Sequence, residues 1–284
     1  VHGNRGFCNI HNEAIMIEYI REKYGIRKVA IVDTDCHHGD GTQDIYWHGP
    51  DTLFISIHQD GRTLYPGTGF PDELGGINAV GRTLNIPLPP HTSEEGYLAA
   101  INNIAMPILK DFKPDLIINS AGQDNHYSDP ITNMNFSAQG YADLTAMLAP
   151  DIAVLEGGYS IEGALPYVNV GIILAMAGVD YNKVKEPNYN AESIRQTQSV
   201  TEAIEKIGDM TLTIWQQRDN IKDKLIEKPE PHRRTRGLYY DTDGIQESQS
   251  EEIQICPDCA GALRIESSSS RGRSILAVHI PRKA

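Results

Sequence analysis

The 284-residue sequence predicts an α/β fold, a parallel sheet flanked by helices, followed by a helical extension and a small C-terminal hairpin. Three observations predict this class. Short β-branched runs alternate with longer segments of helical period between residues 28 and 157. The runs are apolar along their whole length, as in strands that are buried on both faces. Acidic and imidazole side chains follow several of the runs, where open α/β sheets build their sites.

Five runs combine β-branched and apolar residues and are predicted to be strands: 28–33, 52–58, 83–87, 116–121 and 151–156. Five segments have helical period and are predicted to be helices: 12–24, 93–112, 137–148, 161–177 and 191–226. The second helix opens with Ser93 and two glutamates, which favours a helix N-terminus. Pro166 is expected to bend or restart the fourth helix.

The C-terminal quarter changes in composition. Residues 227–252 are rich in Pro, Arg, Ser, Gln and acidic residues and have no sustained period, which is typical of a linker. Residues 253–284 contain Cys256-Pro-Asp-Cys259 and two apolar runs separated by a serine-rich turn, which indicates a knuckle followed by a hairpin. We therefore divide the chain into a domain at 1–180, a helical extension at 181–226, the linker and the hairpin.

Charge and apolar content exclude several classes of protein. The 25 Lys and Arg against 38 Asp and Glu give a net charge of −13, so we expect no direct nucleic-acid binding. The central apolar run at 170–179 is shorter than the ~20 residues of a membrane span. We expect neither a membrane span nor a secretory signal. Four scattered cysteines do not make a disulfide scaffold, which favours a cytoplasmic setting.

Several polar groups follow the first predicted strand. Side chains alternate along a strand, so Asp33, Asp35 and His37 share one face. Groups crowded in this way repel or desolvate one another unless a cation or hydrogen-bond partners compensate them. The sequence therefore predicts a metal site at this strand end.

Two other strand ends add to this site. Asp124 follows the fourth predicted strand and completes a set of two carboxylates and one imidazole with Asp35 and His37. Three protein ligands leave an open position, which is typical of a catalytic divalent site. Tyr159 follows two glycines after the fifth strand, and its hydroxyl is predicted to donate a hydrogen bond to a developing oxyanion.

Seven motifs occur in order between about residues 6 and 179: Gly6-Phe7-Cys8, the block from Asp33 to Thr42, Ser56-Ile57-His58, Tyr65-Pro66-Gly67-Thr68-Gly69, Asn85-Ile86-Pro87-Leu88, Ala121-Gly122-Gln123-Asp124 with Asp129-Pro130, and Gly157-Gly158-Tyr159. Together they resemble the zinc-dependent histone deacetylase family, which includes acetoin-utilisation and acetylpolyamine amidohydrolase proteins. The resemblance implies the arginase/deacetylase fold. It also implies hydrolysis of an N-acetyl amide, on an acetylated lysine of a protein or on a small acetylated amine.

The resemblance assigns roles to residues. It implies that zinc, or ferrous iron as the alternative, is held by Asp35, His37 and Asp124, with Tyr159 polarising the acetyl carbonyl. The residues implied to line the substrate channel are Gly6, Phe7 and Tyr65. The residues implied to give oxygens to a structural potassium ion are Asp33, Asp35, His37, Ser56 and Ile57, and those around a second such ion are Tyr46, Gly49 and Thr52. Oxygen ligands suit a hard cation.

One departure from the family concerns the general base. The family places two adjacent histidines shortly before Gly-Phe-Cys, each oriented by a carboxylate, and Asp33 and Asp40 resemble these carboxylates. The histidines are missing here, although such a base supplies a factor of ~10²–10⁴. We expect them upstream of Val1 in a longer parent sequence, of which this chain is a fragment, with His2 as a possible substitute. The alternative is a non-catalytic module that binds a metal or acyl-lysine.

Two further alternatives concern metals. An arginase-like binuclear manganese hydrolase shares the fold, but the strand before Asp124 lacks the Asp-x-Asp spacing needed to bridge two metals. Cys256 and Cys259 have the spacing of half a zinc ribbon, whereas a structural zinc normally needs four ligands. The cysteines are therefore interpreted as a truncated ribbon, with a redox pair or no metal as alternatives. The tail is also a candidate for binding a protein partner.

Overall fold

The computed structural model describes residues 6–227, 231–240, 243–254 and 262–280. Its centre is a five-stranded sheet with the order β3-β2-β1-β4-β5, and every neighbouring pair is parallel. The strands are β1 (Val29–Asp33), β2 (Thr52–Gln59), β3 (Thr83–Leu88), β4 (Leu116–Ala121) and β5 (Ile152–Leu155). The five predicted strands and the α/β class are confirmed. The predicted burial on both faces holds for β1, β2 and β3, whereas β5, at the edge of the sheet, is only partly buried.

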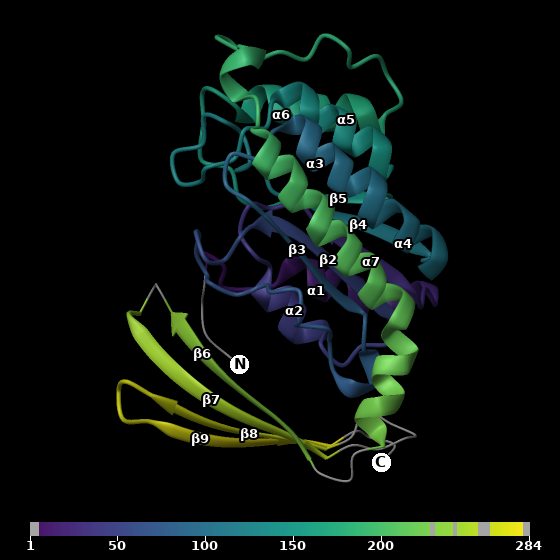
Figure 1. Cartoon of the computed structure of the whole chain (residues 1–284), viewed down its shortest axis with the longest axis vertical. Helices are drawn as coiled ribbons and strands as arrows, with labels where there is room; N and C mark the ends of the chain where they lie inside the picture. Colours follow the sequence, from purple (N-terminus) through teal and green to yellow (C-terminus); the bar gives the residue numbers. More distant parts are fainter. Residues whose placement is uncertain (1–5, 228–230, 241–242, 255–261, 281–284) are drawn as a thin grey trace.

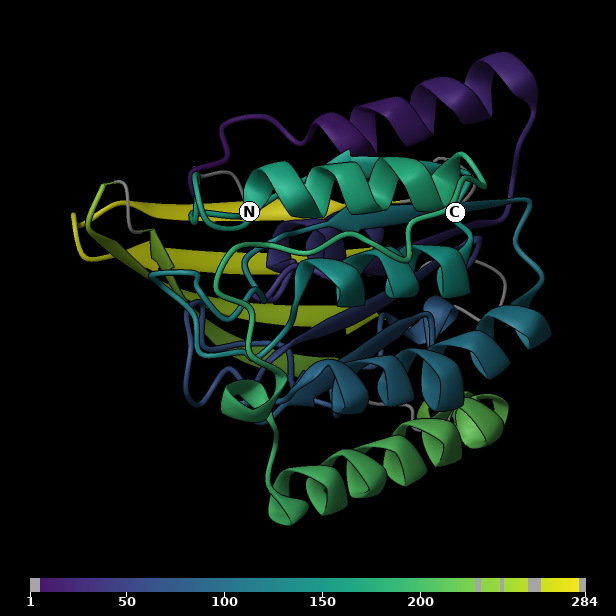
Figure 2. The same ribbon diagram turned by 90° about the horizontal axis from the view of Figure 1, so that it is seen from above.

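Helices cover both faces of this sheet. One face packs against α1 (Asn12–Tyr24) and α2 (Asp40–Tyr46) through Ile17, Tyr46 and Phe54. The larger core lies on the other face, under α3 (Glu94–Ala100), α4 (Met106–Phe112), α5 (Ala138–Leu148), α6 (Leu165–Met176) and α7 (Gln198–Ile226). Figure 2 shows α1 and α7 at opposite sides of the molecule. The result is a three-layer arrangement of helices, sheet and helices.

Local sequence explains where several helices begin and end. The Nδ1 atom of His11 accepts the N–H of Ala14 at the start of α1, and Gly25, with φ of 71°, ends this helix. The Oγ atom of Ser137 accepts the N–H of Gly140 at the start of α5. The predicted helix at 93–112 contains a π-helical turn at Ile101–Ala105. This turn ends two residues before Pro107, which has no N–H to donate.

Some helix boundaries differ from the prediction. The helix predicted at 161–177 begins only at Leu165, because Pro166 suits the first turn of a helix. The helix predicted at 191–226 is a short 3₁₀ turn at Ala191–Ile194 followed by α7. A second 3₁₀ turn lies at Ile77–Ala79. Helix α2 was not predicted, since its seven residues include a glycine and are too few to show a helical period.

A second, antiparallel sheet follows α7, and Figure 1 shows it on the side of α2. Its strands, in the order β6-β7-β8-β9, are β6 (His232–Tyr240), β7 (Ile245–Gln254), β8 (Ala262–Ser269) and β9 (Ser274–His279). The predicted hairpin corresponds to β8 and β9. Cys256 and Cys259 lie outside the described residues, so the zinc-ribbon interpretation stays a prediction.

The prediction of a linker at 227–252 is wrong, because β6 and most of β7 form in this stretch. The two strands have few apolar residues, and their buried face includes Gln249 and Glu251 as well as Leu238 and Tyr240. Because even the buried face of these strands is partly polar, their composition resembles that of a solvated linker. Among the described residues, no helix combines the length and apolar character needed to cross a membrane.

Candidate metal centre

The candidate centre lies where the chain connections diverge within the central sheet. From β1 the next strand, β2, lies on one side, and β4 lies on the other. Open α/β sheets bind ligands in the crevice beyond the carboxyl ends of the strands at such a switch point. Asp35 and His37 follow β1, and Asp124 follows β4. The register of the two strands pairs Asp33 with Ser120, so the two loops leave the sheet side by side.

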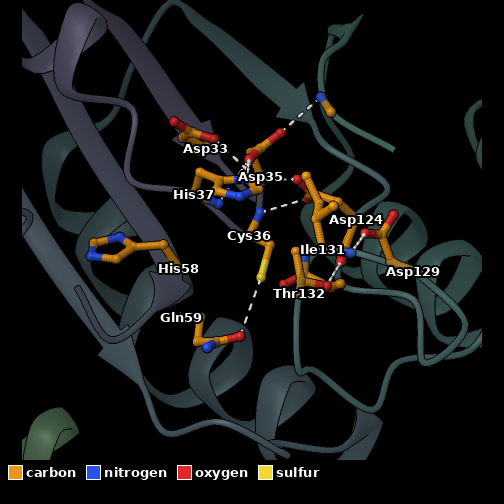
Figure 3. Close-up of polar contacts among 12 residues, drawn as sticks. Asp33, Asp35, Cys36, His37, His58, Gln59, Asp124, Asp129, Ile131 and Thr132 are labelled. Atoms are coloured by element: carbon orange, nitrogen blue, oxygen red, sulfur yellow. Dashed lines mark hydrogen bonds and ion pairs between the residues drawn. The ribbon is translucent and has the colours of Figure 1, made fainter. Parts of the chain in front are cut away.

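The three predicted ligands converge. One potential ligand atom from each of Asp35, His37 and Asp124 lies within 4.8 Å of the other two. The Nδ1 atom of His37 is 2.8 Å from Oδ2 of Asp124 and 3.2 Å from Oδ1 of Asp35. Figure 3 shows the three side chains directed toward one another. Two carboxylate oxygens and one imidazole nitrogen suit a divalent transition metal and leave a position open. The residues present therefore fit the metal that the sequence predicted.

Backbone N–H groups hold the two carboxylates in place. Cys36 donates to Oδ1 of Asp124, and Gly157 donates to Oδ2 of Asp35, each at 2.8 Å. Such outer contacts orient metal ligands. A Cβ atom on Gly157 would lie 2.5 Å from Oδ2 of Asp124 and 2.6 Å from Oδ2 of Asp35. Glycine is required there because the loop after β5 passes directly over both carboxylates.

The electrostatics of the cluster favour a cation. Burial and the neighbouring Asp35 raise the pKa of Asp124 to about 7. Burial, followed by the charge of Asp35, also raises the pKa of Asp33. Burial alone would lower the pKa of His37, but hydrogen bonds to Asp124 and Asp35 raise it to about 10. The two carboxylates therefore attract positive charge to the point where the ligand atoms meet.

Tyr159 and the predicted channel residues surround the same cavity, which has a volume of about 1270 Å³ and is lined by Gly6, Phe7, Tyr65, Tyr159 and the ligands Asp35 and His37. The ring centroids of Phe7 and Tyr159 are 6.0 Å apart, and those of Tyr65 and His37 are 6.5 Å apart. Burial, and then the charge of Asp124, raises the pKa of Tyr159, so its hydroxyl keeps its proton. The structure brings every one of these predicted residues together.

Asp33 and Asp40, the predicted orienting carboxylates, line this cavity as well. The Oδ1 atom of Asp33 accepts the N–H of Asp35 at 3.0 Å, and Asp40 is the first residue of α2. Asp33 therefore contacts the ligand residue Asp35, and Asp40 lines the same cavity. Their predicted task of orienting histidines stays a prediction.

Several residues predicted to bind potassium form hydrogen bonds or strand pairs within the fold. Ser56 is paired with Asp33 across β1 and β2, and its Oγ atom is 2.8 Å from Nδ1 of His58. The carbonyl of Ile57 accepts the hydroxyl of Tyr97 at 2.9 Å. The residues of the second predicted site, Tyr46, Gly49 and Thr52, form consecutive turns through the bonds from Gly49 to Tyr46 and from Thr52 to Gly49. Potassium binding stays a prediction.

The sequence reasoning missed several residues of the cavity. Glu13 of α1 is buried, accepts a hydrogen bond from Ser120 at 2.9 Å, and has a pKa raised by burial to about 7. Glu156 also has a pKa raised by burial to about 7. Arg236 of β6 reaches the cavity from the second sheet and pairs with Asp44 of α2 at 2.5 Å. Glu13 is only weakly recognisable in the sequence, as a polar residue within a predicted helix. No local sequence pattern indicates that Arg236 belongs to the cavity.

The chain is similar to known proteins along most of its length. A sequence model of the histone deacetylase domain matches residues 2–169. A probable deacetylase of Archaeoglobus fulgidus is 44% identical over 245 residues, which are 83% of this chain and 62% of that protein. The acetoin utilization protein AcuC of Bacillus subtilis is 38% identical over 192 residues, which are 63% of this chain and 49% of that protein. The chain thus spans about half to three fifths of the length of these relatives.

A solved structure supports the fold. The crystal structure of the HDA15 HD domain superposes with a TM-score of 0.64 at 28% sequence identity, over 79% of this chain and 63% of that one. The predicted arginase/deacetylase type of fold is confirmed by this neighbour. Since the domain match covers more than half of the chain and includes the converged ligands and most of the fold around them, the chain belongs to the histone deacetylase domain family.

Proposed function

We propose that this chain carries the metal site and the tyrosine of a metal-dependent deacetylase that hydrolyses N-acetylated amines, with acetyl-lysine in proteins as the substrate class. One observation carries the proposal. Two carboxylates and an imidazole converge within 4.8 Å, and two of these ligands, Asp35 and His37, line the same cavity as Tyr159. This combination supplies an open coordination position and a hydrogen-bond donor for the same carbonyl oxygen.

The residues that would hold the metal are Asp35, His37 and Asp124, with zinc as the proposed ion and ferrous iron as the alternative. A bound divalent ion supplies Lewis-acid chemistry at a carbonyl and lowers the pKa of water. Tyr159 donates its hydroxyl proton in a hydrogen bond to the acetyl oxygen as negative charge develops there. Its raised pKa keeps that proton in place at neutral pH.

The remaining residues orient the substrate. Phe7 and Tyr65 flank the aliphatic stem of the acylated side chain, and the Gly6 carbonyl accepts the amide N–H. Ile131 also lines the cavity and is 45% exposed. An apolar side chain at this position suits the methylene groups of lysine better than the cationic chain of a polyamine. Asp33 and Asp40 are proposed to orient the histidines that move the proton of the attacking water.

Three accompanying proposals concern a second ion, the location of the protein and its C-terminal tail. Structural potassium is proposed near Asp33 and Ser56 because oxygen-bearing groups gather there. A cytoplasmic location is proposed from the small number of cysteines. The C-terminal tail is proposed to bind a protein partner.

A second candidate function is a non-catalytic module that binds a metal or acyl-lysine. One observation favours it. In the part of the chain that the structure describes, no histidine donates a hydrogen bond to Asp33, whose Oδ1 atom accepts the N–H of Asp35. Without a positioned base, such a site binds an acylated amine and leaves it intact.

The test compares turnover of a fluorogenic acetyl-lysine peptide and of an acetylated polyamine by the zinc-loaded chain and by a form extended upstream of Val1. We expect turnover of the peptide, faster in the extended form, and its loss in Asp124→Asn. Peptide binding without turnover by either form would support the binding module instead. A preference for the acetylated polyamine would overturn the proposed substrate class.

A further inference from the structure

A chain of hydrogen bonds runs from the segment after α6 to the loop that carries Tyr159. His126, in the loop after β4, is buried between two partners. Its Nε2 atom is 3.1 Å from Oε1 of Glu186, and its Nδ1 atom is 2.9 Å from Oγ of Ser128. The backbone N–H of Ser128 also donates to Nδ1, at 3.2 Å. Because Nδ1 accepts this backbone N–H, Nε2 is the ring atom that donates a hydrogen bond to Glu186.

Glu186 lies outside residues 2–169, which the histone deacetylase domain matches. Its side chain is buried, with 1% exposed, as is that of His126, with 0%. Burial would raise the pKa of Glu186, but the hydrogen bond with His126, backbone hydrogen bonds and the charge of His126 together lower it. The N–H of Ala138, in the first turn of α5, is a second and longer contact of Oε1, at 3.5 Å. A buried carboxylate held in this way fixes the imidazole ring.

The other end of this chain of bonds reaches the neighbour of Tyr159. The Oγ atoms of Ser128 and Ser160 are 2.7 Å apart. Gly163 packs directly against this pair, since a Cβ atom there would lie 2.9 Å from Oγ of Ser160 and 3.3 Å from Oγ of Ser128. The loop that carries Tyr159 therefore packs closely against Ser128 through the residues that follow Tyr159.

The same loop after β4 also holds Tyr159 on its backbone. The N–H of Tyr159 donates to Oδ2 of Asp129 at 2.8 Å. The N–H of Asp129 in turn donates to the carbonyl of His126 at 2.8 Å. Tyr159 and Ser160 are therefore both tied to residues 126–129, and this loop is tied to Glu186 through the imidazole ring.

We propose that Glu186 is a positioning residue for Tyr159 and acts through His126 and Ser128. The inference rests on the proposed function, because it assigns the effect to the tyrosine that assists the reaction. Its physical basis is that a hydrogen-bond donor must lie within a fraction of an ångström of the developing oxyanion, and displacement by 1 Å costs about 100-fold in rate.

The kinetic test uses Glu186→Ala and Glu186→Gln, with Glu192→Ala as the matched control. Glu192 is in the same part of the chain and is 76% exposed. We expect Glu186→Ala to lower kcat by about 10- to 100-fold per bound metal, with little change in KM or metal content. Glu186→Gln should retain most of kcat, because its amide oxygen still accepts the Nε2 proton. Glu192→Ala should match the wild type.

Two further variants separate positioning from folding. Ser128→Ala removes the link at an exposed residue, so it should fold normally and still lower kcat. In a Tyr159→Phe background, Glu186→Ala should add little, since both changes remove the same interaction. Full additivity of the two losses, or an equal loss of kcat and metal content, would show that Glu186 supports the fold alone and would overturn the proposal.

Hydrogen exchange tests the inference without activity. In Glu186→Ala, amides of the segment 157–164 should exchange faster than in the wild type, while those of α7 (198–226) stay unchanged. Unchanged exchange at 157–164 would overturn the positioning role. If the wild-type and extended proteins show no turnover but the exchange difference appears, the proposed function fails and the structural coupling stands.

Discussion

At the scale of single residues, the metal ligands owe their geometry to contacts that are distant in sequence. Asp124 is held by the N–H of Cys36, and Asp35 by the N–H of Gly157. The set of ligands was predictable from the sequence because each one follows an apolar strand. The contacts that aim them were not predictable, since they join loops 88 and 122 residues apart.

Asp124→Asn should weaken zinc binding by at least about 100-fold, because even the loss of an outer partner of a ligand costs 10- to 100-fold. Competition with a chromophoric chelator measures the affinity. Asp209→Asn, which changes an exposed carboxylate of α7, is the matched control and should bind zinc as the wild type does. Equal affinity in the two variants would exclude Asp124 as a ligand.

Tyr159→Phe should lower kcat by about 10²–10³-fold, the usual loss when one oxyanion donor is removed, with KM and metal content little changed. Steady-state kinetics on an acetyl-lysine peptide measures the effect. Tyr239→Phe changes a half-exposed tyrosine of β6 and serves as the control. A full retention of kcat in Tyr159→Phe would contradict the assigned role.

Glu13 should make stability depend on pH. Burial raises its pKa from 4.5 to about 7, so the folded state binds this proton more tightly than the unfolded state. Its contribution is fully present below about pH 4.5 and is lost as the pH rises to about 7. A shift of one pKa unit corresponds to about 1.4 kcal/mol. Between about pH 4.5 and 7, the free energy of unfolding of Glu13→Gln should therefore rise by on the order of 3 kcal/mol relative to that of the wild type.

Urea unfolding of both proteins from pH 4.5 to 8 measures this difference. Other titrating groups are common to the two proteins, so they cancel to a first approximation. A constant difference between the two free energies of unfolding across this range would show that Glu13 is ionised throughout.

At the scale of elements, the strands of the central sheet were easier to predict than those of the second, antiparallel sheet. Strands β1, β2 and β3 of the central sheet are buried along their whole length, and all five strands of this sheet are mainly apolar. In β6 and β7, by contrast, some of the buried side chains are charged and form ion pairs. Arg236 contacts Asp44 of α2 at 2.5 Å and Glu251 of β7 at 3.2 Å, and local sequence carries no sign of either partner.

Arg236→Met should destabilise the protein by about 3 kcal/mol, since it leaves the buried Glu251 and the partly buried Asp44 without their cation. Limited proteolysis should then cut preferentially in β6 and β7. Arg233 lies on the same strand and forms an exposed pair with Glu252. Arg233→Ala should cost less than about 1 kcal/mol. Similar costs for both variants would contradict the role of Arg236 in holding the second sheet against α2.

At the scale of the whole molecule, a bound metal should stabilise the fold. It compensates buried carboxylates that follow different strands, and at a free concentration of 100 times Kd it contributes about 2.7 kcal/mol. A chelator should therefore lower Tm, and zinc should restore it. Magnesium should not restore it, because it prefers a shell of oxygen ligands and several waters. A chelator-insensitive Tm would contradict a metal site in the folded core.

The separation of the ligands along the chain also sets an order of events during folding. His37 and Asp124 are 87 residues apart and meet only because β1 and β4 are neighbours in the sheet. A growing polypeptide that ends before β4 therefore offers two ligands of the three. Loading of the ion must follow the pairing of these strands, so the time at which metal is captured reports when the sheet has assembled.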